Sequence, residues 1–88
     1  MHITFDTNKD KANIEKHGIS LAAASGFEWD EAATWMDERK NYGEVRMCGI
    51  GYIGIRLHYI VYVDRAEVRR IISLRKANMR EVKRYAET

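Results

Sequence analysis

Two segments in the second half of the chain, residues 56–63 and 68–76, restrict the fold more than any other feature. Both are rich in Ile, Val and Tyr, which are enriched in half-buried β-strands. Side chains alternate between the two faces of a strand. In the second segment we therefore expect Val68, Ile72 and Leu74 in the core, and Arg69, Ile71, Ser73 and Arg75 on the other face. In the first segment the same rule sets Arg56, His58 and Tyr62 opposite Leu57, Tyr59 and Val61.

The N-terminal quarter of the chain predicts a short strand followed by two helices. The strand covers residues 3–5. The first helix begins at Asp6 or Thr7 and ends near His17, because Gly18 can adopt the left-handed conformation that terminates helices. A second, short helix runs from a cap at Ser20 to about residue 27.

The remaining segments predict a hairpin and a final helix. A turn signal at residues 40–43 separates residues 32–39 from residues 45–50, and this pattern favours a hairpin. Asn78 is a good helix N-cap with Glu81 three residues later. The predicted fold is α+β, with a short N-terminal strand and two helices, an antiparallel sheet of about four strands and a C-terminal helix. A chain of 88 residues should form a single domain, residues 1–88, with a small core.

Charge is distributed unevenly along the chain. Residues 65–88 contain eight basic and three acidic residues, a formal charge of +5, whereas residues 1–64 contain seven basic and ten acidic residues, a charge of −3. The two sum to the net charge of +2. Such a local density of cations favours binding to a polyanion such as nucleic acid.

Several classes of protein are disfavoured by composition. With Cys48 as the one cysteine no intrachain disulfide can form, which suits a reducing compartment. The start of the chain has no secretory signal pattern, and the longest apolar run, residues 57–63, is too short to span a bilayer. We expect a cytoplasmic protein. The Asp, Glu and His residues do not follow metal-ligand spacing, so we expect neither a metal nor another cofactor.

The polar residues of the predicted strands suit the cleavage of RNA by its own 2′-hydroxyl. If the strands are neighbours, Glu44 and Arg46 join the basic faces to form a groove of Arg, Glu, Tyr and Ser side chains. Arginine binds phosphate through two parallel hydrogen bonds and stays charged, and a placed Glu, His or Tyr can transfer protons. Simpler roles remain open: Arg69 and Arg75 could solvate a sheet face, Arg80 and Lys83 could be solvated on the last helix, and Glu81 could only cap it.

Four motifs, in this order and spacing, resemble the BrnT family of toxins from BrnT/BrnA type II toxin–antitoxin modules. The chain reads K-H-G-I-S at residues 16–20, Y-G-E-V-R at 42–46, Y-V-D-R at 62–65 and R-I-I-S-L-R-K-A at 70–77, followed by Glu81 and Tyr85. The last string together with G-E-x-R is specific, and the resemblance covers nearly the whole chain.

The resemblance implies a RelE-like fold and a metal-independent ribonuclease that inhibits translation. It also implies a BrnA-type antitoxin as partner. Toxin and antitoxin would form a 2:2 heterotetramer that binds operator DNA through the antitoxin. Carried over by position, the catalytic candidates are Arg65, Arg75, Glu44, Arg46 and Tyr85, and the substrate-binding candidates are Arg69, Arg70, Lys76 and Arg56.

Two other functions are compatible with the same residues. RelE-like scaffolds also bind nucleic acid or a protein target such as DNA gyrase without catalysis, and a fold does not determine a function. A basic surface could also do no more than bind an acidic protein partner.

Overall fold

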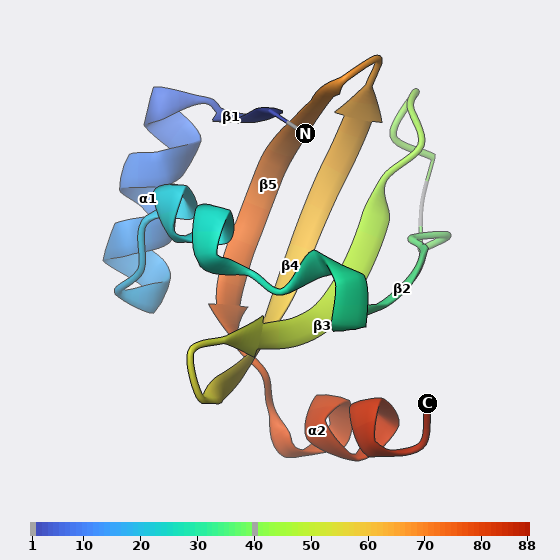
Figure 1. Ribbon diagram of the computed structural model, residues 1–88. Helices are drawn as coiled ribbons and strands as arrows, with labels where there is room; N and C mark the ends of the chain where they lie inside the picture. Colours follow the sequence, from blue (N-terminus) through green and yellow to red (C-terminus); the bar gives the residue numbers. More distant parts are fainter. Residues whose placement is uncertain (1, 40) are drawn as a thin grey trace.

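The protein is built on one five-stranded sheet. The computed structural model describes residues 2–39 and 41–88. The strands are β1 (His2–Phe5), β2 (Ala33–Met36), β3 (Met47–Ile53), β4 (Arg56–Arg65) and β5 (Val68–Lys76), and their order in the sheet is β1-β5-β4-β3-β2 (Figure 1). The sheet thus has five strands instead of about four. The additional strand is β1, which pairs in parallel with the edge of β5, whereas all other pairs are antiparallel.

The predicted hairpin is confirmed, with a shorter first arm and with the second arm shifted from residues 45–50 to residues 47–53. Strands β2 and β3 pair with Ala33 opposite Ile50 and Met36 opposite Met47. The ladder ends where the backbone N–H of Asp37 donates to the carbonyl of Arg46, because beyond this point the Asp37 side chain binds the backbone N–H of Arg39. Residues 37–39 and 41–46 therefore belong to no strand or helix. Lys40, part of the predicted turn, lies outside the described residues.

The predicted helix caps are confirmed. Helix α1 (Thr7–His17) begins with Asp6, whose side chain accepts from the N–H of Lys9, and ends at Gly18 with a φ of 73°. Helix α2 (Met79–Ala86) begins with the capping box between Asn78 and Glu81. The second helix of the prediction consists instead of 3₁₀ turns: η1 (Leu21–Gly26), capped by Ser20, and η2 (Trp29–Glu31). No helix among the described residues is both long and apolar enough to cross a membrane.

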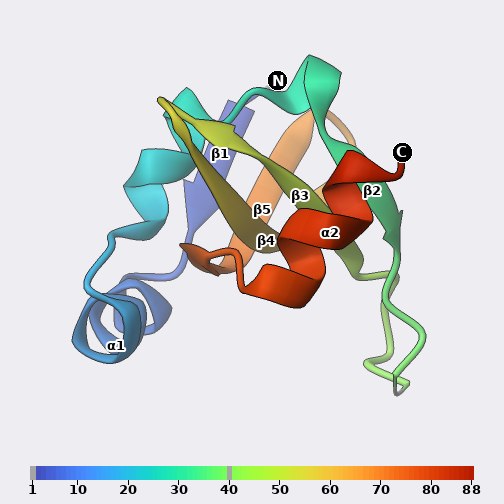
Figure 2. The ribbon, with the colours of Figure 1, turned by 90° about the horizontal axis from the view of Figure 1, so that it is seen from below.

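Both faces of the sheet are covered, each by a different set of elements. Turns η1 and η2 lie over one face, here called the η1 face, and α2 packs against one end of the other, the α2 face (Figure 2). The core of the η1 face consists of Leu21, Ala24, Phe27, Ile60, Tyr62, Ile71 and Leu74. The smaller core under α2 consists of Ile50, Leu57 and Ala77 with Trp35, Tyr52, Tyr59, Val82 and Tyr85 around them.

A β-bulge in β5 changes the faces predicted by simple alternation. Val61 pairs with Ser73 but Tyr62 pairs with Ile71, so Ile72 is the additional residue. Ile71 and Leu74, three residues apart, are both fully buried in the η1-face core. The predictions that Ile72 is core and that Ile71 faces a groove are therefore wrong.

The bulge also separates two arginines that were expected to share a face. Arg69 lies on the η1 face with Tyr62, whereas Arg75 pairs with Tyr59 on the α2 face. The alternation predicted for β4 holds, but His58 and Tyr62 are buried on the η1 face and line no groove with Arg75. Simple alternation would put Arg70 on the same side as Ile72 and Leu74, the predicted core side. In the structure Arg70 is opposite Val63 and shares the α2 face with Arg75.

Candidate functional site

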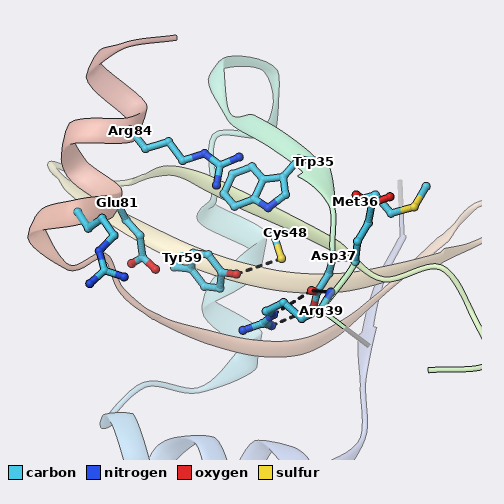
Figure 3. Close-up of a pocket in the computed structure, with 10 residues that line it drawn as sticks. Trp35, Met36, Asp37, Arg39, Cys48, Tyr59, Glu81 and Arg84 are labelled. Atoms are coloured by element: carbon cyan, nitrogen blue, oxygen red, sulfur yellow. Dashed lines mark hydrogen bonds and ion pairs between the residues drawn. The ribbon is translucent and has the colours of Figure 1, made fainter. Parts of the chain in front are cut away.

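A pocket of about 440 Å³ opens on the α2 face between α2 and the loop that follows β2 (Figure 3). We call it the α2 pocket. Strands β3 and β4 supply its floor through Cys48 and Tyr59, and the loop and the helix supply its walls. Its lining residues are Trp35, Met36, Asp37, Glu38, Arg39, Cys48, Tyr59, Arg80, Glu81 and Arg84.

On the loop side, the buried carboxylate of Asp37 holds Arg39 beside the pocket. Arg39 donates from Nε and Nη2 to the two carboxylate oxygens, both at 2.8 Å, and the hydroxyl of Tyr42 donates to the same carboxylate at 3.0 Å. These hydrogen bonds, chiefly those from Arg39, hold the pKa of Asp37 well below its usual value despite burial. The Asp37 side chain is 2 % exposed and that of Arg39 is 68 % exposed, so the guanidinium is oriented yet accessible.

On the helix side, a second Arg–carboxylate pair is formed by Arg75 and Glu81. Two parallel bonds of 2.8 Å join them, the N–H of Asn78 donates to Glu81, and Arg75 lies 4.5 Å above the Tyr59 ring. Burial raises the pKa of Glu81, but the hydrogen bonds from Arg75 and Asn78 outweigh it, so that the pKa is lowered overall. Glu81 thus caps α2, the simpler role considered for it in the sequence, and its carboxylate also holds Arg75 in position.

The floor of the α2 pocket is aromatic. Arg84 lies over the Trp35 ring with its guanidinium carbon 3.7 Å from the centroid, and Trp35 packs against Tyr59. The Tyr59 hydroxyl donates to the sulfur of Cys48 at 3.0 Å. Burial raises the pKa of both groups, so both stay protonated at neutral pH.

A second group of charges lies on the same face of the sheet, around Glu44. Arg65 donates to Oε1 of Glu44, and the charges of Arg46 and Arg70 also act on this carboxylate. The hydrogen bond from Arg65 is the largest cause of the lowered pKa of Glu44. Arg46 stacks 4.1 Å above the Tyr42 ring, and its buried Nε has no hydrogen-bond partner among residues 2–39 and 41–88. We call these residues the Glu44 cluster: Glu44, Arg46, Arg65 and Arg70.

Arg65 of the Glu44 cluster and Arg75 beside the α2 pocket lie near opposite ends of β4, although the two groups adjoin where Asp37 donates its backbone N–H to Arg46. Arg75 pairs with Tyr59, and Arg65 follows Tyr59 by six positions in the strand. At roughly 3.3 Å per residue these positions are about 20 Å apart. Arg65 and Arg75 bind different carboxylates, Glu44 and Glu81, and so do not form one site in this structure.

The other candidates do not join either group. Arg69 forms two bonds with Asp64 and lies 4.4 Å from the rings of both Trp29 and Tyr62. The Tyr85 hydroxyl donates to the carbonyl of Glu31, and its ring packs against Tyr52, so it docks α2. Arg56 and Lys76 are exposed near the β3–β4 turn, in the register that continues the η1 face.

Sequence reasoning missed most of the residues that line the α2 pocket. Trp35, Asp37 and Arg39 belong to a segment that was considered only as a hairpin arm. The spacing of Arg80 and Arg84, one helical turn apart after a clear cap, was the available signal for a basic helix face. In the described part of the chain, no three His, Cys, Asp or Glu side chains gather in a way that could hold a metal ion.

Comparison with known proteins supports the resemblance noted in the motifs. The comparison with curated proteins gives no match. A family model described as the ribonuclease toxin BrnT of type II toxin–antitoxin systems matches residues 5–81, which include β2 to β5, the Glu44 cluster and Glu81. An antitoxin partner and an RNA target follow from that description. The chain therefore belongs to the BrnT family of ribonuclease toxins.

Proposed function

We propose that the protein is a metal-independent endoribonuclease that cleaves RNA at the Glu44 cluster. In this reaction the 2′-hydroxyl of a ribose loses its proton and attacks the adjacent phosphorus in line. The bond to the 5′-oxygen breaks, and this oxygen takes up a proton. The products are a 2′,3′-cyclic phosphate and a 5′-hydroxyl. The observation that carries the proposal is one carboxylate, Glu44, among three guanidinium groups on an accessible surface.

Glu44 is the carboxylate best able to accept the proton of the 2′-hydroxyl. Arg65 occupies its Oε1, while Oε2 has no hydrogen-bond partner among the described residues, and the side chain is 30 % exposed. In contrast, both carboxylate oxygens of Asp37 and of Glu81 accept bonds from arginines, and these side chains are only 2 % and 14 % exposed. A base must reach the proton that it removes, and Glu44 meets this condition.

The arginines of the cluster are suited to bind the phosphate and to stabilise the charge that grows on its oxygens. Arg65 is 63 % exposed and keeps free N–H groups beyond the one that binds Glu44. Arg46 and Arg70 add two further guanidinium groups to the same carboxylate environment. Removal of one preorganised donor of this kind has cost about 3–4 kcal/mol of transition-state stabilisation in other enzymes.

In the cell, this cleavage would inhibit translation until an antitoxin blocks the toxin. We propose a BrnA-type antitoxin, a complex of two toxins with two antitoxins, and binding of that complex to operator DNA through the antitoxin. The basis is the family to which the chain belongs. The sheet with its C-terminal helix is compatible with the RelE-like scaffold that the motifs imply.

The experiment compares purified wild-type protein with Glu44→Gln and Arg65→Ala on single-stranded RNA in the presence of EDTA. We expect cleavage with 2′,3′-cyclic phosphate ends in the wild type, and a loss of about 10²-fold or more in each variant. Lys11→Ala, which removes an exposed cation of α1 outside the cluster, is the control and should cleave normally.

Two results would contradict the proposal. One is cleavage that requires a divalent metal, and the other is full activity of Glu44→Gln and Arg65→Ala. RNA that stays intact while it binds tightly would instead indicate the non-catalytic function.

A further inference from the structure

Among the described residues, one Arg–Trp stack lies on each face of the sheet. The two stacks differ in whether the guanidinium group is also bound by a carboxylate. On the η1 face, Arg69 lies between Trp29 and Tyr62, its guanidinium binds both oxygens of Asp64, and its side chain is 17 % exposed. On the α2 face, Arg84 lies over Trp35, and no carboxylate among the described residues forms an ion pair with it. Both members of the second stack line the α2 pocket, whereas of the first stack Trp29 lines a pocket and Arg69 does not.

We propose that the α2 pocket binds one unpaired nucleotide of the RNA, with its base stacked at the Arg84–Trp35 pair and a backbone phosphate near Arg80 and Arg39. The proposal rests on the proposed ribonuclease function and adds a second contact region for the substrate. Unpaired RNA bases commonly stack on aromatic rings or on the planes of arginine guanidinium groups. Such stacking does not depend on base identity, because every base has a π-face.

The donors that surround this stack are oriented for an anion. Arg80 precedes Arg84 by one turn of α2, and both line the pocket. Across the pocket, Arg39 uses Nε and Nη2 for Asp37, which leaves the N–H groups of Nη1 for a ligand. Figure 3 shows Arg39, Tyr59, Trp35 and Arg84 around the same open space.

The charge balance of the pocket also favours a phosphate. Asp37 and Glu81 are each neutralised by their own arginine, Arg39 and Arg75. Of the remaining lining residues, Arg80 and Arg84 are basic and Glu38 is acidic, an excess of one positive charge. The volume of about 440 Å³ lies within the range of roughly 300–1,000 Å³ found for pockets that hold small ligands.

The position of the pocket determines which step the nucleotide would affect. Trp35 lies level with Val61 of β4, four positions and about 13 Å from Arg65, while pocket-lining Asp37 donates its backbone N–H to Arg46 of the Glu44 cluster. The stacked base would therefore belong to a nucleotide beside the one that is cleaved. It would strengthen the binding of RNA long enough to reach both regions. Substitutions here should therefore raise KM and leave kcat unchanged.

The first test measures binding without cleavage. The probe is a single-stranded oligoribonucleotide in which every 2′-hydroxyl is methylated, so that the attacking group is blocked. We expect it to quench the fluorescence of Trp35, and the quenching should disappear in Trp35→Phe. Arg84→Ala and Arg80→Ala should each bind about tenfold more weakly, whereas Lys11→Ala, which removes an exposed cation of α1, should bind normally. Arg80 has no stacking contact with Trp35 among the described interactions, so Arg80→Ala tests the pocket even if Arg84→Ala fails to fold.

The second test measures cleavage kinetics on long RNA. Arg80→Ala and Arg84→Ala should raise KM about tenfold at unchanged kcat. Glu44→Gln should lower kcat, but the methylated RNA should still quench the fluorescence of Trp35 in this variant. Normal binding in both pocket variants would overturn the inference. A loss of kcat in these variants with intact binding would also overturn it, because the pocket would then be the reacting site. Full activity of Glu44→Gln would instead refute the proposed function alone.

Discussion

At the scale of single residues, the partners of each arginine decide whether it supports the fold or is available to a ligand. Within residues 2–39 and 41–88, four arginines form ion pairs with carboxylates: Arg39 with Asp37, Arg65 with Glu44, Arg69 with Asp64 and Arg75 with Glu81. Arg69 has aromatic rings and a carboxylate around it and is mostly buried, so it stabilises the η1 face. Arg65 has one bond and is largely exposed, so it can bind a phosphate.

Arg65→Ala should move the acidic limb of the pH–rate profile of RNA cleavage. The hydrogen bond from Arg65 is the main cause of the lowered pKa of Glu44, and a general base acts only when it is ionised. In the wild type the rate should therefore rise with pH at values below the usual pKa of a glutamate. In the variant this rise should occur at higher pH, at a lower maximal rate. Profiles of kcat/KM for the two proteins are the measurement, and coincident acidic limbs would show that Glu44 is not the base.

Asp37→Asn should destabilise the protein by about 2–3 kcal/mol near neutral pH, because the buried side chain loses charge-assisted hydrogen bonds to Arg39. The folded-state pKa of Asp37 lies below its unfolded value. This stabilisation is therefore complete above the unfolded pKa of about 3.9 and is lost as the pH falls toward the folded pKa.

Urea unfolding at several pH values measures the difference between Asp37→Asn and wild type. The difference should shrink as the pH falls below about 4. Glu38→Gln, at the exposed neighbouring position, is the control and should stay within about 0.5 kcal/mol of wild type at every pH. A pH-independent difference would show that the charge of Asp37 is unimportant.

At the scale of elements, the outer edge of β5 is protected in two different ways. Strand β1 pairs with β5 only from Val68 to Ile71. Beyond this point the buried side chain of Asn13, in α1, donates to the carbonyl of Leu74 at 2.8 Å and accepts from its N–H at 3.2 Å. One side-chain amide therefore replaces the missing strand partner and fixes α1 against the sheet. Figure 1 shows α1 beside β5.

Asn13→Ala should lower the free energy of unfolding by about 2–4 kcal/mol. It removes the bonds to Leu74 and one to the carbonyl of Ile19, and it leaves buried backbone groups without partners. Chemical denaturation measures the effect. Glu15→Ala, at an exposed position of the same helix, is the matched control and should change stability by less than about 0.5 kcal/mol. Equal stabilities of the two variants would refute the role of Asn13 as an edge partner.

At the scale of the whole molecule, the basic C-terminal third is divided between the two faces of the sheet. The bulge in β5 sends Arg69 into the η1 face, while Arg65, Arg70 and Arg75 lie on the α2 face together with the helix that carries Arg80 and Arg84. A strand of RNA that contacts both the Glu44 cluster and the α2 pocket would run along this one face. The predicted concentration of basic residues is therefore present on the α2 face, although simple alternation assigned some of these residues to the wrong face.

RNA binding should weaken linearly in a plot of log K against log salt concentration. Each phosphate contact on single-stranded nucleic acid contributes a slope of about −0.7. Arg65→Ala and Arg84→Ala should each make the slope less steep by about this amount, because each removes a cation from the proposed path. Lys11→Ala, outside that path, should leave the slope unchanged. Equilibrium titrations with the 2′-O-methylated RNA at several salt concentrations are the measurement, and unchanged slopes in the first two variants would contradict an RNA path along the α2 face.

The sequence alone predicted what depends on short-range chemistry. The caps at Asp6, Gly18 and Asn78 act within one helical turn, and alternation within β4 is a property of the strand itself, so these features were predicted correctly. The motif residues Glu44, Arg46, Arg65 and Arg70 also indicated the family and one cluster of the site. None of these inferences required knowledge of which strands are neighbours.

Only the tertiary structure decided how the strands pair and which arginines share a face. The place of β1 beside β5 and the additional residue Ile72 depend on contacts between distant segments. One additional residue reverses the orientation of every side chain on one side of it. This reversal is the physical reason that Arg69 became a structural residue of the η1 face while Arg75 lies on the α2 face. The pairing of β2 with β3 and the packing of α2 on β3, also contacts between distant segments, bring Arg39 and Arg84 to one pocket.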